Sequence, residues 1–299
     1  MSRSPLYGAI EAGGTKFVCA VARSPQQHLA ELRIPTTSPA ATLDAVQDFF
    51  AVQQQQHGPL AAIGIASFGP VDVRPASPCF GRILATPKLQ WSHTDLVGPL
   101  QQRFACPVAI DTDVNGAALA EAQLGAGRGC DTLVYVTVGT GIGGGICTQG
   151  RTHKGRLHPE LGHLRVLRHP NDRDFAGSCP FHGDCLEGLA SGPAILARYG
   201  AALDALPPSH PAFTQVSYYL GQLVSTLILT LAPDRILLGG GVMQQAALFP
   251  LLRDVAHDLL NGYAGLGDAA WLEQNVCAPA LGQQAGITGA LLLAIAASH

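Results

Sequence analysis

A short segment of the sequence concentrates residue types that bind metal ions. Cys179, His182 and Cys185 follow one another at three-residue spacing in Cys-Pro-Phe-His-Gly-Asp-Cys. Thiolate sulfur and imidazole nitrogen are the usual ligands of zinc, and a closed structural site needs four ligands. The spacing therefore predicts a zinc site rather than a merely polar loop, with a fourth ligand from elsewhere. Candidates for that ligand are four histidines: His153, His158, His163 and His169.

Three glycine-rich turns each follow a predicted strand. They are Gly13-Gly14-Thr15-Lys16, residues 139–145, and Gly239-Gly240-Gly241. Glycine permits positive φ and brings backbone N–H groups close to an anion, and the third turn is expected to lead into a helix N-terminus. One such turn alone is typical of an ordinary loop. Three of them, matching neither the P-loop nor the dinucleotide fingerprint, predict nucleotide binding by another arrangement.

Asp113 occupies a position suited to acid–base chemistry. It ends a predicted strand and begins a predicted helix. Phosphoryl transfer to an alcohol needs a base that takes the hydroxyl proton, together with cationic help for the phosphate oxygens. Aspartate is also a common helix N-cap, and the two roles are compatible.

The elements that must position these residues form two similar series. The first predicts three strands in an antiparallel meander, then alternating helices and strands: 6–10, 16–21, 29–34, 40–56 (helix), 61–66, 94–104 (helix) and 107–110. The second begins at a helix and includes another glycine-turned hairpin: 114–124 (helix), 132–138, 145–148, 213–231 (helix), 235–238, 244–260 (helix) and 285–297 (helix). Within the second series, residues 151–187 show little periodicity. Two α/β units that each open with a hairpin predict a duplicated fold with a cleft between the halves.

Composition narrows the class of protein further. The chain has 299 residues, of which 47% are hydrophobic and 13% charged, so it can bury the cores of two domains. A net charge of −3 offers no basic face for nucleic acid. There is no apolar run long enough for a membrane span, and the start lacks the features of a secretory signal. We therefore expect a cytoplasmic protein, where clustered cysteines indicate metal rather than disulfides.

The glycine turns resemble the nucleotide-binding segments of a known fold. Residues 11–16, 139–143 and 238–242 are similar to the phosphate-1, phosphate-2 and adenosine segments of the actin-like (ribonuclease H-like) sugar kinases. In order and separation they resemble those of the ROK family of bacterial sugar kinases and repressors, from about Tyr7 to Ala297. No helix-turn-helix precedes them, which favours the kinase branch. Residues 67–72, 85–88 and 158–163 resemble the zinc-containing fructokinases within it.

The resemblance implies a role for residues near Asp113. Asp113 corresponds to the family's general base, in a segment that usually reads Asn-Asp, so Thr112 is a departure. A threonine can hydrogen-bond a sugar but lacks the paired donor and acceptor of an amide, and Asn115 is a weak substitute. Glu11 also departs from the family, since aspartate is more common there, where a carboxylate organises magnesium through water.

The other implied contacts fall into three groups. Those to ATP and its Mg²⁺ are Glu11, Gly13, Gly14, Thr15, Lys16, Thr140, Gly141, Gly143, Pro193, Gly239, Gly240, Gly241, Val242 and Met243. Those to the sugar are Gly69, Pro70, Thr112, Glu160, His163 and Glu187. The zinc ligands are His163, Cys179, His182 and Cys185, because the family's zinc histidine ends a Glu-x-Gly-His motif. Lys16 is equally consistent with a solvated hairpin residue, and Glu187 with an exposed carboxylate at a helix start.

The resemblance also implies the domain organisation and the reaction. We expect a small domain over residues 1–113, completed by the helix at 285–299, and a larger one over 114–284 with the zinc loop. The expected activity is ATP- and Mg²⁺-dependent phosphorylation of a hexose, with D-fructose as the favoured acceptor, by a homodimer. Alternatives are a mannokinase or glucokinase, and a sugar-sensing protein without catalysis. An acetate-type kinase or chaperone ATPase would give no reason for the cysteine-rich segment.

Overall fold

The computed structural model describes residues 4–86, 88 and 90–298, and they form two compact units. Unit 1 comprises residues up to Ala120 together with Thr152–His158 and Gln283 onward, and unit 2 comprises Glu121–Arg151 and Pro159–Gly282. Helix α3 (Asp113–Leu124) therefore contributes to both units. The sequence predicts a boundary after residue 113 and places 152–158 in the larger domain, whereas residues 114–120 and 152–158 pack with unit 1 in the structure.

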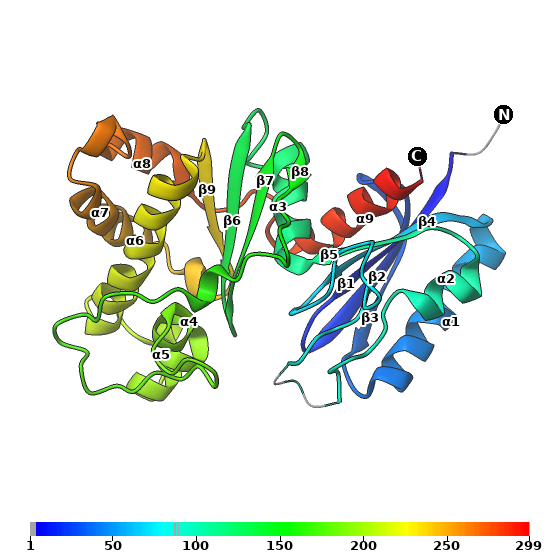
Figure 1. Ribbon diagram of the computed structural model, residues 1–299, viewed down its shortest axis with the longest axis horizontal. Coiled ribbons are helices and arrows are strands. Elements are labelled where there is room, and N and C mark those ends of the chain that lie inside the picture. The colour runs from blue at the N-terminus through cyan, green and yellow to red at the C-terminus, as the bar shows by residue number, and fades with distance from the viewer. Residues whose placement is uncertain (1–3, 87, 89, 299) are drawn as a thin grey trace. The chain divides into compact units, whose positions relative to one another are not determined.

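Unit 1 is built on a five-stranded sheet with the strand order β3-β2-β1-β4-β5 (Figure 1). Strands β1, β2 and β3 form an antiparallel meander, whereas β4 and β5 add to β1 in parallel. Besides α3, its elements are β1 (Leu6–Ala12), β2 (Lys16–Ser24), β3 (Gln27–Pro35), α1 (Pro39–His57), β4 (Leu60–Ser67), α2 (Gly98–Phe104), β5 (Val108–Thr112) and α9 (Ala285–Ala297).

Helices cover both faces of this sheet. Alternate residues of β1 point to opposite sides: Ile10 packs with Phe50 of α1, whereas Ala9 packs with Leu291 of α9. Helix α9 approaches β4 so closely that a Cβ on Gly64 would lie 1.9 Å from the carbonyl oxygen of Ala290. Only glycine fits at position 64, and the helix backbone is thereby held against the sheet.

Unit 2 repeats this topology with a different set of helices. Its sheet has the order β10-β9-β6-β7-β8, in which β6 and β7 form an antiparallel hairpin and β9 and β10 add in parallel. The elements are β6 (Thr132–Val138), β7 (Ile142–Thr148), β8 (Arg151–Thr152), α4 (Leu186–Ala190), α5 (Gly192–Tyr199), α6 (Pro211–Leu231), β9 (Arg235–Gly239), α7 (Leu248–Leu260), α8 (Ala269–Asn275) and β10 (Val276–Cys277). The core of this unit joins β6 and β9 to α4, α6 and α7.

The duplicated α/β fold predicted from the sequence is confirmed, including both hairpins that open the halves. Three elements begin three or more residues away from the predicted start. The helix expected at 94–104 begins at Gly98, because Asp95 accepts the backbone N–H groups of Val97 and Gly98. The strand expected at 145–148 begins at Ile142.

The third difference concerns the third glycine turn. The predicted helix at 244–260 begins only at Leu248, and the turn leads instead into a short 3-10 helix over Val242–Gln244. A helix N-terminus therefore does not follow directly on Gly241, as the sequence analysis had assumed. In the fructokinase-like motif at 85–88, Pro87 lies outside the described residues.

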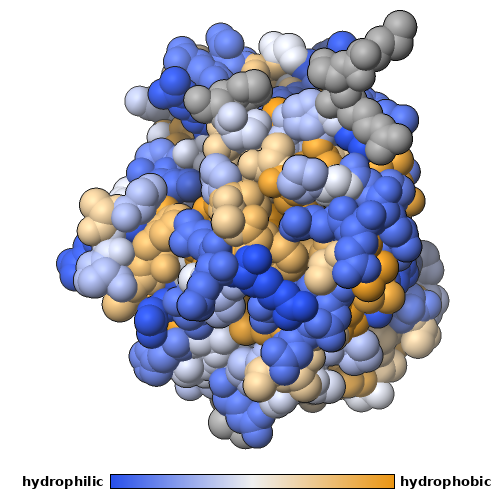
Figure 2. Space-filling model, turned by 90° about the vertical axis from the view of Figure 1, so that its right-hand side faces the viewer, coloured by the Kyte–Doolittle hydropathy of each residue, from blue (hydrophilic) through white to orange (hydrophobic). Residues whose placement is uncertain are grey.

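No helix within the described residues is long and apolar enough to cross a membrane. On the face shown in Figure 2, hydrophobic residues are interspersed with hydrophilic ones.

Candidate functional site

The strand register of unit 1 places the predicted catalytic segment beside two of the predicted binding turns. Ala12 pairs with Ser67 across β1 and β4, and Ser67 pairs with Thr112 across β4 and β5. Three parallel strands thus end at one edge of the sheet. The residues that follow them are Gly13, the Gly69-Pro70 turn and Asp113, and they lie along that edge as neighbours.

Asp113 begins α3, and its side chain is half-buried. Its Oδ1 accepts the backbone N–H of Val114 at 2.8 Å. No hydrogen bond to Oδ2 is found within the described residues. Burial raises the pKa of this carboxyl to about 6, against the lowering effect of hydrogen bonds from the backbone N–H groups of Val114 and of Asp113 itself. A carboxylate with one uncommitted oxygen and a pKa near neutrality is suited to take a proton.

Thr112 supplies the cap that sequence analysis had considered for Asp113. Its hydroxyl accepts the backbone N–H of Asn115 at 3.1 Å, and the residue is 2% exposed. Asn115 is fully buried, with its side-chain nitrogen 2.8 Å from Asp111. Asn115 is therefore held inside unit 1, and its use as a substitute for the family's amide is not supported.

Glu11 lies between the first glycine turn and the start of α9. A Cβ on Gly286 would lie 2.5 Å from its carboxyl carbon. Burial, and then the negative charge of Asp113, raise the pKa of Glu11 to about 7, while Lys16 lowers it. Two carboxyl groups whose ionised forms disfavour one another make a region that a cation would stabilise. Lys16 itself is exposed on the hairpin.

A similar edge occurs in unit 2, where β6 and β9 run in parallel. In the turn after β6, the carbonyl oxygen of Gly139 accepts a hydrogen bond of 2.8 Å from the backbone N–H of Gly192. Gly192 directly precedes Pro193. After β9, Gly240 has φ +89°, and a Cβ there would meet the Val138 carbonyl oxygen at 2.4 Å. The glycine turns and the start of α5 are therefore in contact. Val242 and Met243 follow as buried core residues.

Glu187, near the start of α4, is tied to the same hairpin turn. Its Oε2 accepts the backbone N–H of Ile142 at 2.9 Å. Glu187 is half-buried, so it is not the exposed carboxylate that was the alternative interpretation. Glu160 is exposed and precedes the 3-10 helix Leu161–His163. Their contacts with a sugar remain predictions.

His163, Cys179, His182 and Cys185 come together as a group that can hold a metal ion. Their ligand atoms all lie within 4.8 Å of one another. His163 Nδ1 is 3.5 Å from Cys185 Sγ and 3.8 Å from Cys179 Sγ, which is 3.7 Å from His182 Nδ1. Ligands at zinc distances in a tetrahedron would be separated by about 3.3–3.8 Å. The donor set and its spacing therefore fit a four-coordinate ion.

The other candidate histidines have different contacts. The ring of His158 accepts the backbone N–H of Val71, and His169 packs edge-on against the ring of Tyr218. Between the ligands, Cys179 and Gly183 exchange backbone hydrogen bonds of 2.9 and 3.1 Å, which close a tight turn. The turn directs Cys179 and Cys185 to the same side.

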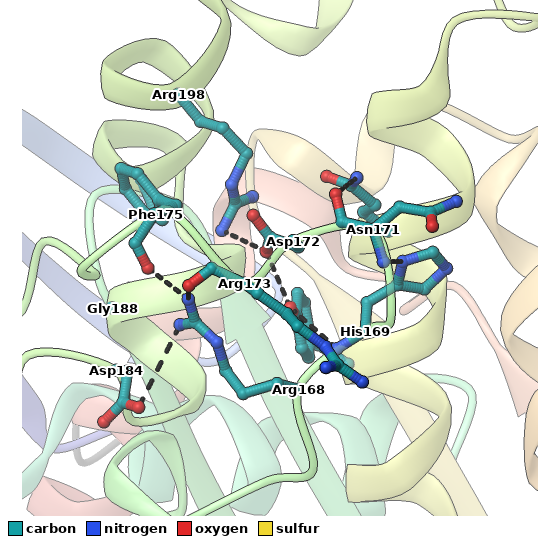
Figure 3. Close-up of polar contacts among 12 residues, drawn as sticks. Arg168, His169, Asn171, Asp172, Arg173, Phe175, Asp184, Gly188 and Arg198 are labelled. Carbon is teal, nitrogen blue, oxygen red and sulfur yellow. Dashed lines mark hydrogen bonds and ion pairs between the residues drawn. The ribbon is translucent and has the colours of Figure 1, made fainter.

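The loop that carries these ligands is also fixed by side chains that do not bind metal (Figure 3). Asp172 forms a buried ion pair of 3.0 Å with Arg198 of α5 and accepts a 2.6 Å hydrogen bond from Tyr219 of α6. Arg168 donates to the carbonyl oxygens of Arg173 and Phe175. The Arg198 guanidinium lies over the Phe175 ring, 4.3 Å from its centre.

Sequence analysis identified the metal group but missed two polar residues that hold the Asp113 segment. Asp111 is fully buried and forms an ion pair of 2.9 Å with Lys154. The available signal was a charged residue inside a short apolar strand, a position where charge is rare unless paired. Nothing in the sequence indicated Lys154, which lies 43 residues away in a segment without periodicity.

Comparison with known proteins places this arrangement in a family. The model of the ROK family matches residues 7–297. The chain belongs to the ROK family. It is 46% identical over 297 residues to a fructokinase from Zymomonas mobilis and 44% identical over 292 residues to one from Pediococcus pentosaceus, with 98% of each chain covered in both cases.

Solved structures of the family have the same fold. A ROK hexokinase from Thermus thermophilus is 27% identical with a TM-score of 0.78, covering 97% of this chain and 98% of that one. A ROK glucokinase from Streptomyces griseus, in complex with glucose and AMPPNP, is 25% identical with a TM-score of 0.72, covering 97% and 99%. The two similar sheets are those of the actin-like fold of ROK sugar kinases.

The buried ion pair gives a stability prediction. Replacing Asp172 with Asn leaves the buried Arg198 guanidinium without its counter-charge. Within the described residues, Nε, Nη1 and Nη2 of Arg198 have no hydrogen-bond partner that could compensate. We expect the free energy of unfolding to fall by about 3 kcal/mol, measured by urea denaturation. Arg103→Met, which breaks an exposed pair with Asp48, should change it by less than about 1 kcal/mol. Equal effects of the two variants would contradict the prediction.

Proposed function

We propose that this protein is an ATP-dependent fructokinase that forms fructose 6-phosphate. The general activity, hexose phosphorylation with ATP, follows from membership of the family and from fructokinase relatives at 38–46% identity over most of the chain. Glucokinases of the family are more distant, at 26%. The preference for fructose over glucose or mannose is therefore supported by similarity.

One observation in the structure carries the catalytic proposal: the register that ends three parallel strands at Ala12, Ser67 and Thr112. It places Asp113 beside the Gly69-Pro70 turn. In the proposed reaction Asp113 accepts the proton of the sugar hydroxyl while the hydroxyl oxygen bonds to the γ-phosphorus of ATP. The bond from that phosphorus to the bridging oxygen breaks, and ADP leaves.

The nucleotide would be held by backbone rather than by many charged side chains. By resemblance, the turns at Gly13–Lys16, Gly139–Gly143 and Gly239–Gly241 are the segments whose N–H groups would bind phosphate oxygens. The N–H groups of Gly13 and Gly139 are already used in hydrogen bonds within their own turns. Glu11 is the residue that would organise Mg²⁺, and its position beside Asp113 fits a cation there. Bound with ATP, Mg²⁺ neutralises charge on the phosphates. Glu11 and Asp113 are then both stabilised in their ionised forms.

We further propose that the metal group holds zinc with a structural role. Four protein ligands leave no open position for water, so the ion would not take part in the chemistry. His163 ends the segment that begins at Glu160, so a bound ion would fix Glu160 for contact with the sugar. The cytoplasm as its location and a homodimer as its assembly complete the proposal, on the basis of cysteine usage and family resemblance.

A hexose panel tests the activity. ATP consumption should depend on added sugar and be fastest with fructose. A coupled assay should then detect fructose 6-phosphate as the product. Asp113→Asn, which keeps an acceptor for Val114 N–H but cannot take a proton, should lower kcat by about 10²–10⁴-fold. Sugar-independent ATP hydrolysis that survives this substitution would refute the kinase proposal. Fastest turnover with glucose would favour the glucokinase alternative.

The raised pKa of Asp113 predicts the acid limb of the rate profile. Only the ionised carboxylate can accept a proton, and bound Mg²⁺ would favour that form, so kcat at saturating Mg²⁺ and ATP should rise with pH along a limb at or below about 6 and level off above it. The pKa of Glu11 is also raised, to about 7. Saturating Mg²⁺ should keep Glu11 ionised, so that Glu11 contributes little to the pH dependence of kcat. Glu11→Gln should retain this limb. An acid limb that persists unchanged in the residual activity of Asp113→Asn would exclude Asp113 as the base.

The raised pKa of Asp113 also predicts how the stability of the protein changes with pH. A carboxyl whose pKa is raised on folding holds its proton better in the native state. Its ionisation therefore lowers stability as pH rises from about 4 to above 6. Asp113→Asn removes this loss. The variant should gain stability relative to the unmodified protein over that range, by at most about 3 kcal/mol, in denaturation experiments at several pH values.

Removal of zinc should loosen the loop without abolishing the fold. We expect about one zinc ion per chain. A chelator should release it, and the zinc-free protein should unfold at a lower Tm. The KM for sugar should rise more than the KM for ATP, because Glu160 precedes a ligand. His182→Ala should lose the ion, whereas His153→Ala, at an exposed histidine outside the group, should retain it. Unchanged sugar kinetics after complete zinc removal would refute the scaffold role.

A further inference from the structure

The segment Thr152–His158 packs with unit 1, although the chain before and after it belongs to unit 2. We refer to these residues as the 152–158 segment. At one end Thr152 and Lys154 contact Asp111. At the other end the ring of His158 accepts the backbone N–H of Val71 at 3.3 Å. The segment thus contacts both the strand that leads to Asp113 and the turn that contains Gly69 and Pro70.

The Asp111 carboxylate is fully buried and has two partners on each oxygen. Oδ1 accepts the backbone N–H of Thr112 at 2.9 Å and the side-chain N–H of Asn115 at 2.8 Å. Oδ2 accepts the Thr152 hydroxyl at 2.7 Å and pairs with the Lys154 ammonium at 2.9 Å. A buried carboxylate is tolerated when it is paired and hydrogen-bonded in this way.

The contacts of Asp111 lie on both sides of Asp113 in the sequence. Asp111 bonds to the backbone of the residue before Asp113 and to the side chain of Asn115, two residues after it. Asn115 is held in turn by its N–H bond to Thr112. A single buried carboxylate therefore contacts the chain on both sides of Asp113, in addition to the strand pairing of β5 and the helix α3. Lys154, whose side chain is 32% exposed, supplies the positive charge that this carboxylate requires.

We infer that Asp111 and Lys154 form a positioning pair, which holds the Asp113 carboxylate in place through Thr112 and Asn115. Neither residue need touch the substrate. Without Lys154, the buried Asp111 lacks its counter-charge, and the residues that it fixes are free to shift. A misplacement of about 1 Å at a reacting group costs on the order of 10²-fold in rate. The pair should therefore act on turnover more than on sugar binding.

This inference rests on the proposed function for its kinetic test. Lys154→Met, at a partly exposed position, should lower kcat about 10- to 100-fold and leave the KM for fructose nearly unchanged. Lys154→Arg keeps the charge and should recover most of kcat. Arg103→Met removes an exposed ion pair of the same unit and should behave like the unmodified protein. Wild-type kcat in Lys154→Met, or equal losses with Arg and Met, would overturn the inference.

Hydrogen exchange separates this inference from the proposed function. In Lys154→Met, amide exchange at residues 112–116 should accelerate, with exchange in α1 unchanged and with Arg103→Met as the control. This measurement needs no activity. If the unmodified protein phosphorylates no hexose, the proposed function fails while the exchange data still decide whether the pair holds the segment. Unchanged exchange at 112–116 would overturn the inference even in an active enzyme.

A second substitution tests whether the two residues act as one unit. Asp111→Asn should lower kcat like Lys154→Met, and the double variant should be no slower than the slower single variant, because contacting residues are not additive. Multiplied losses in the double variant would show independent roles and contradict the pair. The circular dichroism spectrum of each variant establishes that it is folded before the kinetics are compared.

Discussion

Parallel hydrogen bonding between β1, β4 and β5 is the constraint on which the candidate site depends. It aligns Ala12, Ser67 and Thr112 at one edge of the sheet. Side chains alternate along a strand, so a slip of one residue would exchange the buried positions of Ile110 and Asp111. The register is therefore strongly specified. The backbone contact between Gly64 and α9 reinforces it, because the helix fits against only one arrangement of β4.

The second unit has a corresponding sheet edge, where β6 and β9 end. Its glycine turns after β6 and β9 are in contact with the start of α5, and Glu187 is bonded to the hairpin turn. These contacts involve mostly backbone atoms. The N–H groups of Gly139, Ile142 and Gly192 are used in these contacts, which hold the glycine turns against α4 and α5.

The metal-bearing loop is stabilised by two separate sets of interactions. Near its middle, Asp172, Arg198 and Tyr219 attach it to α5 and α6. Gln222 of α6 adds a pair of hydrogen bonds, of 2.7 and 3.1 Å, to the backbone of Leu167. At its end, the group of two cysteines and two histidines is spaced for an ion. A loop with few apolar residues of its own thus gains order from polar contacts and ligand chemistry.

Local pattern in the sequence predicted most elements of the fold, both hairpins and the metal group, but not β8, α4, α5, α8 or β10. Apolar periodicity, glycine at strand ends and the spacing of Cys179, His182 and Cys185 are short-range signals that survive without coordinates. Family resemblance added Asp113 and His163. The tertiary structure alone decided which polar residues hold Asp113, since Asp111 meets Thr152 and Lys154 across about forty residues of chain. Two further features were also visible only in the tertiary structure: α7 begins at Leu248, and the hydroxyl of Thr112 caps α3. Such contacts depend on how the chain returns to a sheet edge, and that path is set by packing over the whole unit rather than by neighbouring residues.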